Sequence, residues 1–134
     1  MKINGGCHCG YISYEAEIDP DKIVVCHCTD CQTLSGSPFR WVAPTRESTF
    51  KLQSGELKIY VKTAESGAKR AQSFCPECGT PIYATSAEAE PKFYGLRVGS
   101  ISQRDKLLPK SQMWARSEQE WVADLNSVPR VGRR

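Results

Sequence analysis

The sequence lacks any long hydrophobic segment. Its longest purely apolar run, residues 23 to 26, is far too short to span a bilayer. The first ten residues, MKINGGCHCG, contain no apolar core of a signal peptide. We therefore expect neither membrane insertion nor export, and we expect a cytoplasmic location, where thiols stay reduced.

Histidine is also scarce, with two residues, whereas cysteine is abundant, with seven. The thiols occur as CxC, CxCxxC and CxxC motifs. An odd number in such motifs suits metal binding better than a disulfide framework. Metal–thiolate chemistry is therefore the leading interpretation, with zinc as the expected ion.

The composition lacks the extremes that mark disordered or fibrous chains. The 134 residues include 40% hydrophobic and 25% charged side chains, which is ordinary for one globular domain. We expect a single zinc-binding β domain over residues 1–127 and a basic tail over residues 128–134.

The formal net charge of +3 is weak evidence for a nucleic-acid partner. Seven thiolates around two divalent cations would bring this charge to zero. The basic end PRVGRR, with Arg130, Arg133 and Arg134, is typical of a solvated tail. Trp41, Trp114 and Trp121 lie in apolar patterns and are expected in the core, so no exposed aromatics accompany the basic residues. We expect no nucleic-acid partner.

Alternating apolar and polar residues predict a mostly β fold. The turn signals between these segments indicate antiparallel pairing. The predicted strands are residues 11–17, 39–43, 50–53, 57–61 and 93–98.

Little helix is expected. Residues 30–34 lack strand alternation and can form a helical turn after Cys28, which Gly36 would end. Ser117 and Glu120 are spaced as a capping box and predict a second short helix.

Seven cysteines divide naturally into four and three. Structural zinc sites are closed by four protein ligands, whereas catalytic sites hold three and leave the fourth position open. Residues 7–10 (CHCG) and 75–79 (CPECG) both place glycine directly after the second thiol, as a knuckle requires. The predicted closed site is Cys7, Cys9, Cys75 and Cys78. The predicted open, catalytic site is Cys26, Cys28 and Cys31.

Three other interpretations stay open at this stage. A long-spaced ribbon would join Cys28 and Cys31 to Cys75 and Cys78. The CPEC motif could be a redox pair, although Gly79-Thr80-Pro81 is unsuited to a helix interior. Both sites could also be structural, with His27 or Asp30 completing the second one.

Each histidine lies between two cysteines. Alternate side chains of an extended CxC point to opposite faces, so His8 and His27 should face away from the metals. His27 would then be a proton relay near the site or, as the simpler alternative, a surface residue without a role.

The motifs GGCHCGYISYEA, CHCTDCQTLSG, SFCPECGTPIYA and YGLRVGSI, followed by LPKSQMW and Trp121, resemble the glutathione-dependent formaldehyde-activating enzymes and their centromere-protein-V-like relatives. The resemblance runs from Gly6 to about Trp121. It implies an Mss4-like β-tent with the same two cysteine groups as zinc sites. It also implies a carbon–sulfur lyase activity that condenses formaldehyde with glutathione to S-hydroxymethylglutathione.

The chain departs from that family at positions that affect charge. Relatives often carry arginine two residues before the FCxxCG phenylalanine and basic residues just after CxCxxC, where this chain has Gln72, Gln32 and Thr33. Glutathione is anionic, so these missing cations weaken the substrate assignment more than the zinc assignment.

Two kinds of function follow. In the enzyme, the open site would activate either a thiol or an aldehyde carbonyl, and His27, Asp30 or water would manage the proton. The alternative is a zinc-stabilised binding module without catalysis.

Overall fold

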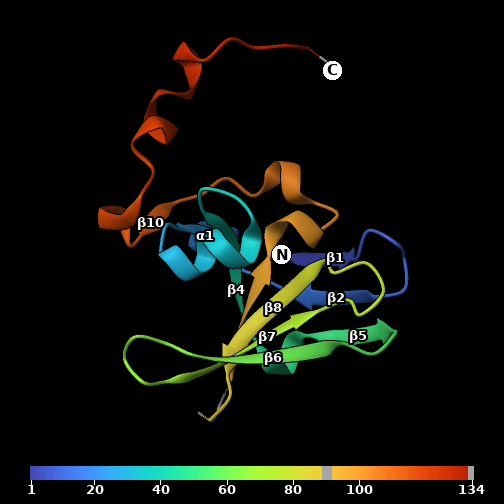
Figure 1. The fold of residues 1–134 in the computed structure, drawn as a ribbon. Helices are drawn as coiled ribbons and strands as arrows, with labels where there is room; N and C mark the ends of the chain where they lie inside the picture. Colours follow the sequence, from blue (N-terminus) through green and yellow to red (C-terminus); the bar gives the residue numbers. More distant parts are fainter. Residues whose placement is uncertain (89–91, 133–134) are drawn as a thin grey trace.

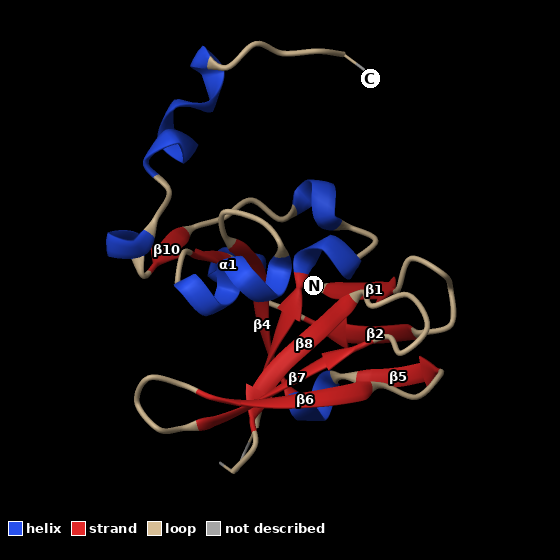
Figure 2. Ribbon diagram, viewed as in Figure 1, coloured by secondary structure: helices blue, strands red, loops and turns tan. Residues whose placement is uncertain are grey.

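A computed structural model describes residues 1–88 and 92–132. It is mostly β, as predicted, with two sheets and one α-helix (Figures 1 and 2). The strands are β1 (Lys2–Gly6), β2 (Ser13–Glu17), β3 (Val24–Cys26), β4 (Arg40–Arg46), β5 (Lys51–Ser54), β6 (Lys58–Thr63), β7 (Lys69–Phe74), β8 (Pro81–Ser86), β9 (Phe93–Arg97) and β10 (Ser111–Met113). The helix α1 covers Thr29–Ser35. Short 3-10 helices cover Pro20–Lys22, Glu47–Thr49, Val98–Ser100, Arg104–Lys106, Ala115–Ser117 and Glu120–Ser127.

The small sheet has the strand order β1-β2-β5, and the large sheet has the order β10-β3-β4-β9-β8-β7-β6. All five predicted strands are present, as β2, β4, β5, β6 and β9, with bounds shifted by up to two residues or extended. Their pairing is antiparallel, as predicted, and the one parallel pair in the described part is β10 with β3. No helix in these residues is long and apolar enough to cross a membrane.

The helical turn predicted after Cys28 is confirmed as α1. Cys28 is its N-cap, and its sulfur accepts a hydrogen bond from the Cys31 N–H at 3.2 Å. Gly36 ends the helix in the left-handed conformation, with φ 64°, and its N–H donates to the Gln32 carbonyl. The sequence between two cysteines thus forms a tight turn that faces both thiols toward one point.

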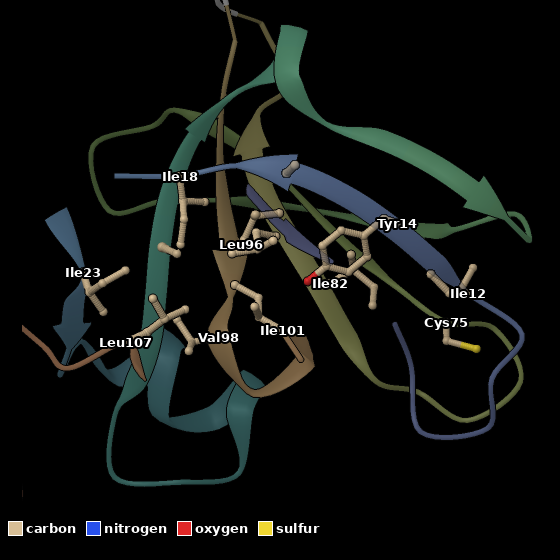
Figure 3. Close-up of a cluster of buried hydrophobic side chains, with 13 residues drawn as sticks. Ile12, Tyr14, Ile18, Ile23, Cys75, Ile82, Leu96, Val98, Ile101 and Leu107 are labelled. Carbon is tan, nitrogen blue, oxygen red and sulfur yellow. The ribbon is translucent and has the colours of Figure 1, made fainter. Parts of the chain in front are cut away.

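The core lies between the two sheets and is organised by Tyr14 (Figure 3). Its ring is fully buried and stacks on Phe50 at 5.1 Å. Its hydroxyl lies 2.7 Å from Ser100 Oγ, which in turn donates to the Arg97 carbonyl. Burial raises the pKa of Tyr14 to about 12, so the hydroxyl stays protonated and serves as the donor. This bond ties the small sheet to the segment that follows β9.

The C-terminal segment differs from the sequence prediction. Residues 120–132 extend away from the body (Figure 1), and Trp114 and Trp121 are 43% and 50% exposed rather than in the core. Among the three tryptophans, Trp41 packs against the core as expected. An apolar side chain is buried only where another part of the protein lies against it. This segment leaves the large sheet after β10, so its tryptophans have no such surface to pack on.

The predicted capping box is also wrong. The C-terminal segment forms a 3-10 helix from Glu120, its N-cap is Gln119, and no side chain caps it. Asp124 interrupts it with non-helical angles. Of the predicted basic tail, Arg133 and Arg134 lie outside the described residues.

Gly5 gives a test of how the sheets pack. A Cβ at this position would overlap the Ser100 carbonyl oxygen and lie 2.6 Å from the Tyr14 hydroxyl oxygen. We expect Gly5→Ala to lower the free energy of unfolding by about 1–3 kcal/mol in urea titrations, because the backbone must shift. Gly99→Ala is the matched control, since no atom lies within 4 Å of its added Cβ. Equal effects of the two substitutions would contradict the close packing at Gly5.

Candidate metal centres

The structure gathers the seven cysteine sulfurs into two groups. In each group, all sulfurs lie within 4.8 Å of one another. The groups are Cys7, Cys9, Cys75 and Cys78, and Cys26, Cys28 and Cys31. The seven cysteines therefore divide into four and three, as the glycine after each CxC or CxxC turn predicted. The alternative ribbon, which would join Cys28 and Cys31 to Cys75 and Cys78, does not form.

The four-cysteine centre has dimensions that suit zinc. The Cys7 and Cys9 sulfurs are 3.6 Å apart, and the Cys9 and Cys75 sulfurs are 3.8 Å apart. Four sulfurs about 2.3 Å from a tetrahedral zinc ion lie about 3.8 Å from each other. The donor set and its spacing therefore fit a closed tetrahedral site.

Two similar turns build this centre. Gly10 and Gly79, directly after the second cysteine of each turn, have φ of 87° and 81°, which a side chain would oppose. The N–H of Ile12 donates to the Cys7 sulfur at 3.2 Å, and the N–H of Glu77 donates to the Cys75 sulfur at 3.4 Å. Such bonds stabilise thiolates and orient them.

Cys78 is the thiol most readily ionised. The hydroxyl and the backbone of Thr80 lower the pKa of Cys78 to about 5, with the hydroxyl 3.2 Å from the sulfur. Thr80 also accepts a hydrogen bond from the His8 N–H at 3.0 Å. This one residue thus joins the two turns and polarises one ligand.

The three-cysteine centre lies where β3 passes into α1. Cys26 ends β3 and is buried, whereas Cys28 and Cys31 belong to the first turn of the helix and are partly exposed. No fourth histidine, cysteine or acidic ligand joins them among the described residues. The geometry therefore provides three sulfur donors at this centre.

Electrostatics distinguish the thiols of this centre. Burial, followed by the neighbouring thiols Cys28 and Cys26, raises the pKa of Cys31 to about 12. Burial also opposes ionisation of Cys28, but bonds from Cys31 and Cys26 and the charge of Lys62 outweigh it and lower its pKa. Closely spaced thiols cannot all ionise alone, so a divalent cation would release protons as it binds.

His27 is not among the groups that gather at the three-cysteine centre, as expected from its place between two cysteines. Its Nε2 lies 2.7 Å from Gln112 Oε1 on β10, and its ring meets Phe39 edge-on. The expectation of a surface histidine is wrong, because the residue is only 1% exposed. His27 therefore packs β10 against the start of α1.

Asp30 is likewise not a ligand. Its carboxylate pairs with the ammonium group of Lys62 on β6 at 2.8 Å. This pair spans from α1 to the far edge of the large sheet, and it places a cation close enough to Cys28 to affect its ionisation.

The structure corrects the expectation that cations are missing near this centre. Arg40 on β4 and Arg97 on β9 both donate to the Gln72 side-chain oxygen, at 3.3 and 2.9 Å. The thiols of Cys31 and Cys26 interact electrostatically with both guanidinium groups. Sequence reasoning missed these arginines because they are far from the cysteine motifs along the chain.

Known proteins show similar sequences and folds. An uncharacterised lyase of Schizosaccharomyces pombe is 32% identical over 79 residues, which are 59% of this chain and 54% of the yeast protein. The chain thus matches about half the length of that relative. A solved structure of a Rhodobacter sphaeroides protein has a TM-score of 0.63 at 22% identity, covers 82% of this chain and 99% of its own, and shares the fold.

The sequence profile of the glutathione-dependent formaldehyde-activating enzymes matches residues 2–117, which include both cysteine centres. This match extends over most of the chain, as the resemblance of the cysteine motifs predicted. The protein therefore belongs to the family of glutathione-dependent formaldehyde-activating enzymes.

Proposed function

We propose that the protein is a zinc-dependent lyase that joins a small aldehyde, such as formaldehyde, to glutathione or another thiol. The observation that carries this proposal is the three-cysteine centre, which is separate from a complete four-cysteine centre. The family supports the reaction class, and the yeast relative is named a lyase. A cytoplasmic location, where free thiols are abundant, is part of the proposal.

Each centre would hold one zinc ion. Cys7, Cys9, Cys75 and Cys78 would hold a structural ion, and Cys26, Cys28 and Cys31 would hold the second. A zinc ion in an open site supplies Lewis acidity and favours the thiolate form of a thiol.

The reaction requires no redox partner. The substrate sulfur bonds to the carbonyl carbon, the carbonyl π electrons move to oxygen, and the thiol proton ends on that oxygen. The reverse reaction breaks the same carbon–sulfur bond and returns the proton. The developing negative charge on oxygen needs a cation or a proton donor close by.

Among the candidates that the sequence raised for this role, His27 Nε2 is bonded to Gln112, and Asp30 is paired with Lys62. The ammonium group of Lys62 is a proton donor close enough to Cys28 to lower the pKa of its thiol. Asp30 holds it in position across the sheet. We therefore assign Lys62 the role of stabilising the oxygen, with Asp30 as its positioning residue.

Zinc content and folding should separate the two centres. We expect Cys28→Ala to remain folded and to lose one zinc ion per chain, measured by elemental analysis and circular dichroism. We expect Cys75→Ala to lose its fold, because Cys75 is fully buried in the core and a structural zinc ion contributes about 10 kcal/mol. If both variants unfold alike, the three-cysteine centre is structural and the proposal is wrong.

Activity should appear in exchange between the free thiol and its adduct. NMR exchange spectroscopy of formaldehyde with glutathione should show faster exchange with zinc-loaded protein than without it. Cys28→Ala should reduce the exchange to the uncatalysed rate. An absence of acceleration with glutathione and with simpler thiols would favour the zinc-stabilised binding module instead.

The role of Lys62 can be tested in the same assay. We expect Lys62→Met to reduce the catalysed rate roughly 10- to 100-fold with unchanged zinc content, because the charge on oxygen loses its donor. Lys58→Met, on the same strand, is the control and should retain the wild-type rate. Equal rates for the two variants would remove Lys62 from the mechanism.

A further inference from the structure

Arg40 and Arg97 form a buried cationic pair without an acidic partner. Arg40 is 4% exposed, its Nε has no hydrogen-bond partner, and the two side chains share the oxygen of Gln72. The one ion pair of the described residues is Lys62 with Asp30, so no described carboxylate pairs with either arginine. Burial and then repulsion from Arg40 lower the pKa of Arg97 to about 9. Buried charges are normally paired with a counterion. An anion bound to this pair would supply that counterion.

Strand register brings this pair beside the three-cysteine centre. Cys26 on β3 lies directly opposite Arg40 on β4, and Val42, two residues on, lies opposite Arg97 on β9. Opposite residues, and residues two apart on a strand, share a face of the sheet. Cys26 and both arginines therefore point to the same side, the side from which α1 contributes Cys28 and Cys31.

The same register places Gln72. This residue lies opposite Ala84, which lies opposite Gly95, two residues before Arg97. A Cβ at Gly95 would lie 3.5 Å from a guanidinium nitrogen of Arg97, so the side chain lies over the glycine. Small residues on β8 and β9 thus leave space across which both arginines reach Gln72.

Both arginines border cavities. A cavity of about 330 Å³ is bordered by Leu34 of α1, by Tyr60, and by Gln72, Arg40 and Arg97. A second cavity of about 400 Å³ is bordered by Ser35 and again by both arginines. Leu34 and Ser35 lie one helical turn after Cys31, on its side of the helix. A ligand in either cavity therefore lies about one helical turn from Cys31.

The cysteines alone do not neutralise this pair. Three thiolates and a divalent ion carry one net negative charge, whereas the two guanidinium groups carry two positive charges. One positive charge remains in a buried pocket that offers several N–H donors. A planar carboxylate matches the planar guanidinium donors in charge and geometry.

We infer that Arg40, Gln72 and Arg97 form a subsite that binds a carboxylate of the thiol that reacts at the three-cysteine centre. The inference rests on the proposed function for the identity of the reacting group, but not for the existence of the subsite. Gln72 holds the two guanidinium groups together with its oxygen and leaves their remaining N–H groups to the ligand. Arg40 and Arg97 are thus the residues that select an acidic thiol over a neutral one.

The opposing view is that the arginines only balance the charge of the thiolates. It predicts that arginine substitutions weaken zinc binding and that ligands with and without a carboxylate bind alike. The subsite predicts a preference for the carboxylate that disappears when the pair is neutralised.

A matched pair of thiols tests this. Calorimetry would compare 3-mercaptopropionate with 3-mercaptopropionamide on zinc-loaded protein. We expect the acid to bind roughly 10- to 100-fold more tightly, which is the range for charge-assisted bonds to one carboxylate. The two thiols differ in acidity, but this difference is the same for every variant. The ratio of the two affinities is therefore compared between wild type and each variant.

Gln72→Glu is the decisive variant, because it places a carboxylate between the two arginines without removing either. It should fold, keep its zinc and lose the preference for the acid. Arg40→Gln should also lose the preference, and Arg46→Gln, at the exposed end of the same strand, should keep it. A preference of similar size in wild type and Gln72→Glu, or none in wild type, would overturn the subsite.

A ligand without sulfur separates the subsite from the proposed reaction. NMR of the arginine side chains should show that propionate, but not propionamide, shifts the Arg40 Nε–H signal, in wild type and in Cys28→Ala. If propionate shifts the signal while no thiol reaction is accelerated, the subsite stands and the proposed function fails. If the reaction is accelerated equally for acid and amide and propionate shifts nothing, the function stands and the subsite is wrong.

Discussion

The contact between the two cysteine turns is the constraint on which the rest of the structure depends. It brings the Cys9 sulfur within 3.8 Å of the Cys75 sulfur across 66 residues of sequence. The small sheet and the large sheet share no strand, so this contact, the core around Tyr14 and the bridge from Gly5 to Ile101 hold them together. Clustered thiolates repel one another, and a divalent ion converts that repulsion into a cross-link. A metal ion at the four-cysteine centre would therefore strengthen the packing of the two sheets.

The same contact also fixes the neighbourhood of the three-cysteine centre. Gln72 lies on β7, three residues before Cys75, so the turn that holds Cys75 also sets where Gln72 meets the arginines. The loop after Cys78 then borders the cavities next to Arg40 and Arg97, through Gly79, Thr80 and Pro81. The structural centre thus forms one wall of the pocket beside the open centre. Loss of the first metal would disturb the second site without any direct contact between the ions.

Short-range patterns predicted more of this structure than long-range placement. The division of the cysteines followed from spacing and trailing glycines, because each knuckle is built from a few consecutive residues. Strand β7 was missed because its sequence, KRAQSF, is polar and does not alternate clearly, and its strand pairs decide its place. The Arg40–Arg97 pair depends on the register of β3, β4 and β9, which no single segment contains. Trp114 and Trp121 were wrongly predicted in the core for a related reason. A local apolar pattern does not indicate whether another part of the protein is available to cover it.

The charges of the open centre explain why an apolar pocket would not serve there. Three thiolates around a divalent ion would leave a negative centre, and a fourth thiolate from the proposed substrate would add to it. In low-dielectric surroundings this added charge would be strongly opposed, and the substrate would keep its proton. Arg40, Arg97 and Lys62 approach from three different strands and offset the charge without occupying the open position. Burying two guanidinium groups side by side is unfavourable by itself, but it becomes favourable once the thiolates and an acidic ligand are in place. Under the proposed function, the arrangement would stabilise the loaded site more than the empty one and would couple the affinity for the substrate to the ionisation of its thiol.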